Sequence, residues 1–495
     1  MAYIRHDKDN NQVNPQPGST TVNELSGNDG WATVTYKNFN ADYVARNNNN
    51  TSRTPGTYQA RNTDNTTRTP ASYNRHDDTC LPQSALDFRF AQRKSLTDQV
   101  SGKNLITFTR AGTATYVDAG GFVKTAAVNE PRFDHNPTTG ECEGLLIEGS
   151  KTNLFTYSTQ FDQTDWDNVR STEVIASTIE DPQGDGSQTA FKLIATTDNN
   201  THRLDKINLS MATSRPHTMS VWAKAGEYTG VSLTIADTSN NQNGVYFDLS
   251  AGTFTTSGVN YNGKMDAYPN GWYRCFATIT STGNDIASLS QRCLIGVLKD
   301  GSTHTYEGDG TSGIYIWGAQ LIESDFNLNG LFTSYIPTEG STVARAAEVA
   351  EVTGTNFTSF YNQSEGTFFV DALSTGGRIL GVSDGTTSNR QEITSSASNN
   401  MVFQQRNGTM EVNLNEAGMD RKSAFSYASN DYSISGGGST VTAAQKDTSA
   451  TPPTGMDRMK IGVWYNNTDQ INGYVRRAGY LSYKVSDTIL PKFTT

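Results

Sequence analysis

Several features that would narrow the class of this protein are scarce or missing in its 495 residues. The four cysteines lie far apart without a CxxC or Cys/His spacing, so neither a zinc site nor a disulfide scaffold is expected. No apolar run reaches the roughly 18 residues that a membrane span requires, and the first residues form no secretory signal. We therefore expect free thiols, synthesis in a reducing cytoplasm and no membrane insertion.

Basic charge is also scarce, which bears on the partners of the chain. Only 18% of the residues are charged, and the formal net charge is −11. A nucleic-acid-binding surface needs an excess of basic residues to displace counterions, so no nucleic-acid partner is expected. Hydrophobic residues make up only 35% of the chain. A chain of this length and composition favours several modest domains over one large core.

What the sequence does contain is the pattern of short β-strands. It has 44 glycines, 22 tyrosines and 21 phenylalanines, and many polar turns separate short apolar runs. "LITFTR", residues 105–110, alternates with period two, and "DAGG", residues 118–121, predicts a tight hairpin turn. Only "SDTILPKF" near the end predicts a helical turn. The predicted fold class is all-β, with an irregular extended N-terminal arm followed by β-sandwich or jelly-roll domains.

The N-terminal segment contains a repeat of 15 residues, in which "YVARNNNNTSRTPGT" is followed by "YQARNTDNTTRTPAS" and then "YNRHDDT". Each repeat has almost no aliphatic residues and cannot close a core alone. Tyrosine and arginine are typical of docked interfaces and poor choices for a linker, although a flexible linker that happens to repeat stays open. The predicted anchoring residues are Tyr43, Arg46, Arg53, Tyr58, Arg61, Arg68, Tyr73 and Arg75.

Acidic residues and a histidine crowd into "NEPRFDHNPTTGECEGLLIEGSKTNL", residues 129–154. Asp134 and His135 are neighbours, so an extended strand would point them to opposite faces and keep them out of one pocket. "HNPTTGE" has turn chemistry, and "GLLIE" reads as a buried return strand. We expect Arg132 or His135 to pair with Glu148 or Glu141 across this hairpin. The stretch is therefore interpreted as a structural strap, not a catalytic site.

No protein cofactor is expected, but one loop can supply a structural Ca²⁺ site. "EDPQGDGSQ" places several carboxylates in a glycine-containing loop, which offers the oxygen ligands that calcium prefers. Asp-Pro-x-Gly is also an ordinary turn, so both interpretations stay open. The candidate metal ligands in this loop are Asp181 and Asp185.

The order of the motifs resembles that of a module in virion proteins of tailed bacteriophages. "FTRA", "TYVD", "PRFDH", "GLLIE" and "TNL" follow one another as in that module. "GWYRCFATIT" and "IYIWGAQLIESDF" resemble a carbohydrate-binding-like jelly roll, and the segment from "GRILGVSDG" to "SYKVSDTIL" is similar to a concanavalin-like, laminin-G-type sandwich. The resemblance covers roughly residues 84–495 and implies a virion appendage, fibre or decoration protein. Related jelly rolls often hold a structural calcium near the loop of Asp181, sometimes with an acid of the last strand, so the resemblance adds Glu323 to the candidate metal ligands.

These observations together predict four segments. They are an extended anchoring arm with 15-residue repeats (1–79), a β-hairpin strap or connector module (80–156), a carbohydrate-binding-like jelly roll (157–349) and a concanavalin-like β-sandwich (350–495).

Sugar binding would use aromatic faces at loop tips or along one sheet. Trp222, Trp272 and Trp317 belong to the motifs that carry the resemblance, and we expect them to pack in a core. The candidate glycan-binding residues lie in or near predicted turns and are Tyr228, Tyr246, Tyr261, Tyr268, Trp464 and Tyr465.

We expect a non-enzymatic structural protein of a tailed-phage virion, made in the cytoplasm of the bacterial host. Its arm would bind other virion proteins of the capsid, neck or tail, and a homotrimer would bury sheet edges. Its sandwiches would adhere to glycans of the host surface. A cement protein without ligand binding is the first alternative, and a polysaccharide depolymerase is the second. The ExDxxE run of concanavalin-like glucanases, HExxH and a P-loop are all missing.

Overall fold

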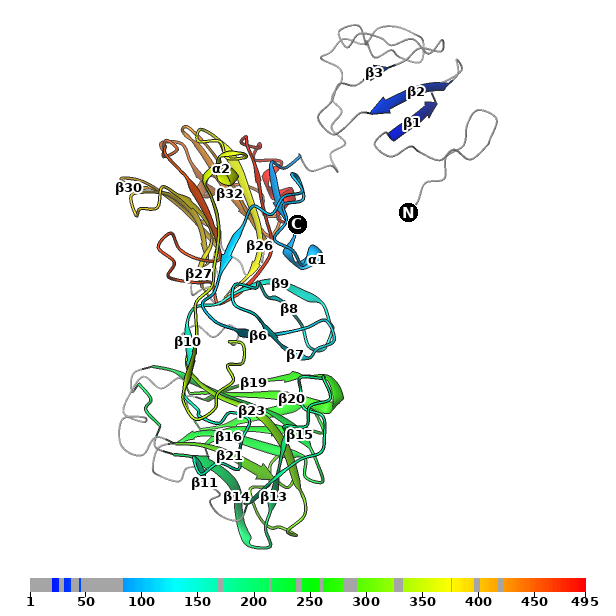
Figure 1. Ribbon diagram of the computed structural model, residues 1–495. Coiled ribbons are helices and arrows are strands. Elements are labelled where there is room, and N and C mark those ends of the chain that lie inside the picture. Colours follow the sequence, from blue (N-terminus) through cyan, green and yellow to red (C-terminus); the bar gives the residue numbers. More distant parts are fainter. Residues whose placement is uncertain are drawn as a thin grey trace. The chain divides into compact units, whose positions relative to one another are not determined.

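The fold was obtained as a computed structural model, and its elements are those of an all-β protein (Figure 1). The structure describes residues 20–25, 31–36, 44–45 and 83–495, the last range without 168–171, 208, 213–214, 237–242, 259–260, 280–291, 325–332, 375, 396–400 and 417–421. The chain divides into two compact units, Met1–Cys80 and Leu81–Thr495.

The first unit contains a three-stranded antiparallel sheet. Its strands are β1 (Thr20–Leu25), β2 (Trp31–Tyr36) and β3 (Val44–Ala45), with β2 in the middle. All predicted anchoring residues lie outside the described residues, namely Tyr43, Arg46, Arg53, Tyr58, Arg61, Arg68, Tyr73 and Arg75.

One domain of the second unit is jelly-roll-like and consists of two antiparallel sheets. The first sheet has the order β11 (Trp166–Asp167), β14 (Asn199–Lys206), β21 (Arg292–Leu298), β16 (Gly230–Ala236), β17 (Gly244–Asp248) and β18 (Thr253–Ser257), and β22 (Thr305–Glu307) pairs with β14. The second sheet has the order β12 (Thr172–Ala176), β13 (Phe191–Ala195), β23 (Gly313–Glu323), β15 (His217–Ala225), β20 (Trp272–Ile279) and β19 (Tyr261–Ala267). A 3₁₀ turn, η3 (Pro269–Gly271), precedes β20.

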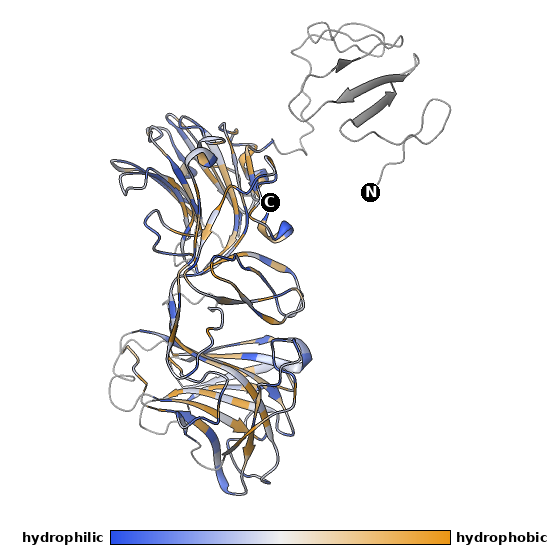
Figure 2. Ribbon diagram, viewed as in Figure 1, coloured by the Kyte–Doolittle hydropathy of each residue, from blue (hydrophilic) through white to orange (hydrophobic). Residues whose placement is uncertain are grey.

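The core of this domain lies between its two sheets because alternate residues of each strand point inward. On β15, Met219, Val221 and Ala223 are fully buried in that core. Trp222 lies between two of them in sequence and therefore belongs to the opposite, outer face of the six-stranded sheet. Figure 2 shows hydrophobic segments alternating with hydrophilic ones along the strands.

The C-terminal domain is a second sandwich of two antiparallel sheets. One has the order β30 (Thr409–Glu416), β29 (Met401–Asn407), β28 (Asn389–Ser395), β27 (Gly377–Ser383), β34 (Arg458–Ile461), β25 (Val349–Thr353) and β5 (Thr107–Thr109). The other has the order β33 (Lys446–Asp447), β32 (Asp431–Gly436), β31 (Lys422–Ala428), β26 (Gly366–Leu373), β35 (Gly473–Leu481), β9 (Cys142–Ile147) and β8 (Phe133–His135), and β4 (Leu86–Phe88) pairs with β35. Short helical pieces complete it, namely α1 (Phe90–Arg93), α2 (Gly354–Thr358), η4 (Ala443–Gln445) and η5 (Leu490–Phe493).

Strands from the connector segment complete the sheets of this C-terminal sandwich. β4, β5, β8 and β9 all pair within them, and Phe88, Leu145 and Ile147 are fully buried in their shared core. The N-terminal part of the second unit thus folds together with its C-terminal part. The predicted helical turn in "SDTILPKF" is confirmed as η5.

A hairpin of the connector, β6 (Ala114–Val117) and β7 (Val123–Ala126), contacts the jelly-roll-like domain. Its turn is the predicted one, with Gly121 at φ +82°. The amide of Val123 donates to the carbonyl of Pro182 at 3.0 Å, and the ammonium of Lys124 donates to the carbonyl of Gln183 at 2.5 Å. A Cβ on Gly184 would lie 2.1 Å from the ring of Phe122, so only glycine fits under this ring. The loop 180–187 is therefore the seat of the hairpin.

A two-stranded ribbon, β10 (Lys151–Asn153) and β24 (Val343–Arg345), joins the segments that enter and leave the jelly-roll-like domain. Among the helices of the described residues, none is long and apolar enough to cross a membrane.

Candidate functional site

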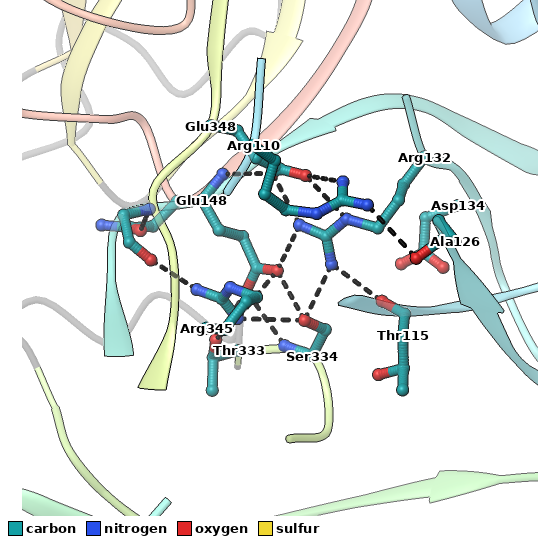
Figure 3. Close-up of polar contacts among 12 residues, drawn as sticks. Arg110, Thr115, Ala126, Arg132, Asp134, Glu148, Thr333, Ser334, Arg345 and Glu348 are labelled. Carbon is teal, nitrogen blue, oxygen red and sulfur yellow. Dashed lines mark hydrogen bonds and ion pairs between the residues drawn. The ribbon is translucent and has the colours of Figure 1, made fainter. Parts of the chain in front are cut away.

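A buried cluster of arginines and glutamates forms where the connector, the jelly-roll-like domain and the C-terminal sandwich meet (Figure 3). Its charged members come from strand ends, and each side chain is at most 3% exposed. We call this set the joint cluster, and it consists of Arg110, Arg132, Glu148, Arg345 and Glu348.

Glu348 is the centre of the joint cluster. Its carboxylate accepts from Nε of Arg132 at 2.8 Å and from Nη2 of Arg132 at 2.6 Å, which is the paired geometry that a guanidinium favours. It also accepts from Nη1 of Arg110 at 2.9 Å and from the amide of Glu148 at 3.0 Å. A buried charge with this many donors is fully compensated.

Glu148 ties the cluster to the segment that leaves the jelly-roll-like domain. It accepts from the amide and the hydroxyl of Ser334 at 2.9 and 2.6 Å, and it pairs with Nη1 of Arg345 at 3.0 Å. Nη2 of Arg132 lies 2.8 Å from it, which confirms the predicted Arg132–Glu148 pair. Burial alone would raise the pKa of Glu148, but Arg345 and Arg132 outweigh it and hold the pKa well below its usual value.

The acidic stretch 129–154 is thus a structural strap in its contacts. Three arginines and two glutamates pair with one another, so the carboxylates of Glu148 and Glu348 are engaged in ion pairs within the protein. The turn predicted in "HNPTTGE" is confirmed, because Asn136 and Glu141 close it by a backbone hydrogen bond of 2.9 Å.

One part of the strap interpretation was wrong. Asp134 and His135 line one cavity, whereas strict strand alternation would have put them on opposite faces. The physical reason is a β-bulge between them, which shifts the register against β9. Both reach the same residue, since Asp134 accepts from the amide of Val117 and Nδ1 of His135 lies 3.0 Å from its carbonyl. Tyr474 also donates to Asp134, at 2.8 Å.

This cavity has a volume of about 330 Å³ and lies between the β6–β7 hairpin, β8 and the outer face of the six-stranded sheet. The sheet contributes Trp222 from β15 and Arg274 and Phe276 from β20. The guanidinium carbon of Arg274 lies 4.3 Å from the ring centroid of Trp222 and 4.7 Å from that of Phe276. The cation therefore contacts two aromatic rings, which stabilise it, and Arg274 also lines the cavity. We call this space the hairpin cavity.

The three tryptophans of the predicted core are buried as expected. Trp222, Trp272 and Trp317 are 1%, 1% and 2% exposed and share one cluster on the outer face of the sheet. Nε1 of Trp272 donates to the carbonyl of Glu180 at 3.1 Å, and Nε1 of Trp317 donates to Thr189 at 2.8 Å. Nε1 of Trp222 has no hydrogen-bond partner in the part of the chain that the structure describes.

The predicted glycan-binding tyrosines are scattered over the jelly-roll-like domain. Tyr228 is only 7% exposed and packs in the inner core, so its expected position at a free surface turn was wrong. Tyr246 is half-buried against His304, with ring centroids 4.3 Å apart. Tyr261 donates its hydroxyl to the carbonyl of Ile235. None of these three lines the hairpin cavity.

Among the other predicted glycan-binding residues, only Tyr268 reaches that cavity. Its ring lies 5.6 Å from that of Trp222. Trp464 and Tyr465 lie in the C-terminal sandwich with their ring centroids 4.9 Å apart. The guanidinium carbon of Arg378 lies 4.9 Å from the ring centroid of Trp464. The four tyrosines lie in the jelly-roll-like domain and the pair Trp464 and Tyr465 in the C-terminal sandwich, so the six residues do not form one site.

The acids of the predicted calcium loop are used inside the protein. Asp181 accepts from the amide of Gln183 at 2.9 Å, from Ser187 at 2.8 Å and from Thr189 at 2.6 Å. Asp185 accepts from Ser187, and Glu323 lies 3.6 Å from Arg215. In the described part of the chain no three acidic, histidine or cysteine side chains gather as a metal site. The expected set Asp181, Asp185 and Glu323 was therefore wrong, because the loop folds around its own donors.

One motif that resembles a catalytic signature also has a structural role. Residues 381–385 read G-V-S-D-G and match the GxSxG pattern of serine hydrolases. That chemistry needs a strand, a sharp turn and a helix, with the serine exposed on the turn. Here Ser383 ends β27, is 4% exposed and accepts from the amide of Gly385, and the chain continues into β28. The match is a turn between two strands.

Sequence reasoning did not single out Arg274 and the hairpin cavity. A signal was available, because "WYRCF" places Trp272, Arg274 and Phe276 on one face of a strand. A hairpin from about 150 residues earlier covers this face, and no local sequence pattern predicts such a long-range contact.

The described thiols are free, as expected. Cys275 and Cys293 are fully buried in the inner core on different sheets, and Cys142 is half-buried. Burial raises the pKa of both Cys275 and Cys293, so these thiols are unreactive.

No family model matches the sequence, and no curated protein matches it. Among solved structures, the chain is similar to domains LG4-5 of the mouse laminin alpha1 chain, with 11% sequence identity over 68% of this chain and 88% of that chain and a TM-score of 0.17. This score is too low to carry an argument, and the all-β sandwich architecture rests on the strands described above.

Proposed function

We propose that this chain is a non-enzymatic structural protein of a tailed-phage virion, a fibre or decoration appendage. Residues 1–79 attach it to other virion proteins, and its sandwich domains are displayed for adhesion to glycans of the host surface. The proposal joins the motif order of the sequence with one structural observation, the joint cluster. A display protein has to hold its domains in a fixed relative orientation, and we infer that the buried ion-pair cluster fixes that orientation.

The joint cluster supports the proposal through the parts of the chain that it links. Arg110 and Glu348 belong to segments that are 238 residues apart in sequence, yet their side chains lie 2.9 Å apart. Connector strands β5, β8 and β9 lie in the C-terminal sheets, while the β6–β7 hairpin rests on the loop before β13. The connector therefore serves both domains at once, as expected of a load-transmitting part and not of a flexible linker.

The attachment role is tested by deletion of residues 1–79 and expression of the remainder during phage infection. Since the second unit is compact by itself, we expect the truncated chain to fold and to be absent from purified particles. The full chain with the same tag is the control. Normal incorporation of the truncated chain would contradict the attachment role.

Adhesion is tested with a cell-binding assay on residues 81–495. A cut at residue 157 would remove β4, β5, β8 and β9 from the C-terminal sandwich and is unsuitable. Binding to host cells that is lost after periodate oxidation of surface sugars is the expected result. Absence of binding to any host strain would favour a cement protein.

We also propose a homotrimer, which would have three times the chain mass in sedimentation analysis.

A further inference from the structure

The hairpin cavity contains buried polar atoms that no group of the described residues satisfies. These atoms are Nε of Arg274, Nε1 of Trp222 and Nε2 of His135, and all three residues line the cavity. The residues are 6%, 1% and 6% exposed. A buried polar atom without a partner destabilises the folded state, and native proteins leave few of them. Three in one cavity indicate that something polar occupies it.

The chemistry of the unsatisfied atoms defines the occupant. Nε of Arg274 and Nε1 of Trp222 carry hydrogens and need acceptors. Nδ1 of His135 faces the carbonyl of Val117, which can only accept, so Nδ1 carries the hydrogen. With a single hydrogen on the ring, at Nδ1, Nε2 is an acceptor. A ligand with several oxygens, some of them hydroxyls, meets all three requirements.

The charged residues of the cavity lining indicate which charge the ligand carries. Lys264 and Asp266 pair with each other at 2.8 Å, and Glu143 pairs with Arg476 at 2.7 Å. Arg274 has no carboxylate of the described residues within ion-pair distance, and its contacts are the hydroxyls of Ser220 and Tyr268 and the aromatic rings.

A buried guanidinium without a counterion is compensated best by an anion with two oxygens. Asp134, the remaining acid of the lining, is already held by the amide of Val117 and the hydroxyl of Tyr474.

We propose that the hairpin cavity binds a pyranose unit that carries a carboxylate, with the carboxylate on Arg274 and ring hydroxyls toward His135 and Trp222. The proposal rests on the glycan adhesion proposed above and assigns it a site and a sugar class. The volume of about 330 Å³ suits one such unit, since ligand pockets usually begin at roughly 300 Å³. The partly exposed pair Lys264–Asp266 lines the cavity and marks its contact with solvent.

The test is a saturation-transfer NMR titration of the full chain with D-glucuronate and with methyl β-D-glucoside, which has the same ring without the carboxylate. We expect glucuronate to bind about tenfold or more tightly than the glucoside, in line with a charge-assisted pair. Arg274→Met keeps the aliphatic stem between Trp222 and Phe276 and should lose at least that factor. Arg215→Met, at an exposed position two residues before β15, is the matched control and should bind as the wild type does.

Thermal melting shows whether Arg274→Met is folded. If it is not, Trp222→Phe removes one donor while keeping a ring and should weaken glucuronate binding severalfold. Equal binding of both sugars would overturn the carboxylate assignment, and absence of binding, or unchanged binding by the variants, would overturn the site. Host-cell binding that persists in Arg274→Met would leave glycan adhesion standing and remove only this cavity from it.

Discussion

Replacement of Glu348 by glutamine is the most informative perturbation of the joint cluster. The wild-type cluster has three guanidiniums and two carboxylates, a net charge of +1, and Glu348→Gln raises it to +2 without changing the volume. The new amide group also directs its own N–H hydrogens at Arg132, whose Nε and Nη2 now donate to the carboxylate at 2.8 and 2.6 Å. Breaking a buried ion pair on one side costs about 3–5 kcal/mol.

That cost should be visible in thermal unfolding. A domain of roughly 150–250 residues loses about 2–4 °C of Tm per kcal/mol, so the expected decrease is roughly 6–20 °C. Differential scanning calorimetry of the full chain measures it, and far-UV circular dichroism follows the same transition. Asp457→Asn is the control, because the Asp457 side chain is 52% exposed and its pair with Arg458 should contribute less than about 1 kcal/mol. A decrease for Glu348→Gln no larger than that of the control would refute the structural role of the cluster.

Three further results are expected. The pKa of Glu148 lies well below its usual 4.5, so its stabilisation is full above that pH and is lost as the pH falls through the lower folded value. The stability difference between wild type and Glu148→Gln in urea titrations should therefore stay constant from pH 8 to about 5 and shrink below about 4.5; a difference that shrinks already at pH 6 would contradict it. Gly184→Val should lower the free energy of unfolding by about 2 kcal/mol or more in a urea titration. The reason is that Gly184 has φ +61° and an added Cβ would lie 2.1 Å from the ring of Phe122. Gly186→Ala is the control and should cost less, because the space around its Cβ is open. Millimolar EDTA should leave the Tm unchanged, since Asp181 is held by its own loop, and a clear decrease would restore the calcium site.

The parts of the structure that could be predicted from the sequence are those fixed by local patterns. Strand alternation predicted the all-β class. The order "PRFDH", turn, "GLLIE" predicted that Arg132 or His135 pairs with Glu148 or Glu141 across one hairpin, and the structure forms the pair of Arg132 with Glu148. The other half of the cluster was not predictable. Glu348 lies 216 residues after Arg132, and nothing in the sequence near either residue announces the other.

The errors have the same origin. Asp134 and His135 share a cavity because a bulge breaks the period of two, and bulges depend on the partner strand. Tyr228 lies next to a turn in sequence but is drawn into the core by Tyr306, whose ring is 5.3 Å away. Asp181 resembles a calcium ligand until the hydroxyls of Ser187 and Thr189 are found within hydrogen-bond distance.

The most direct test of the account is amide hydrogen exchange at the joint cluster, followed by NMR or mass spectrometry on the wild-type chain. The amides of Glu148 and Glu348 donate across the joint, to the side chain of Glu348 and the carbonyl of Glu148, both at 3.0 Å. If the strap locks the two sandwiches together, these amides exchange as slowly as those of the central strands β15 and β26. Exchange at the rate of exposed loop residues such as 454–455 would show that the joint opens freely and would contradict the central claim.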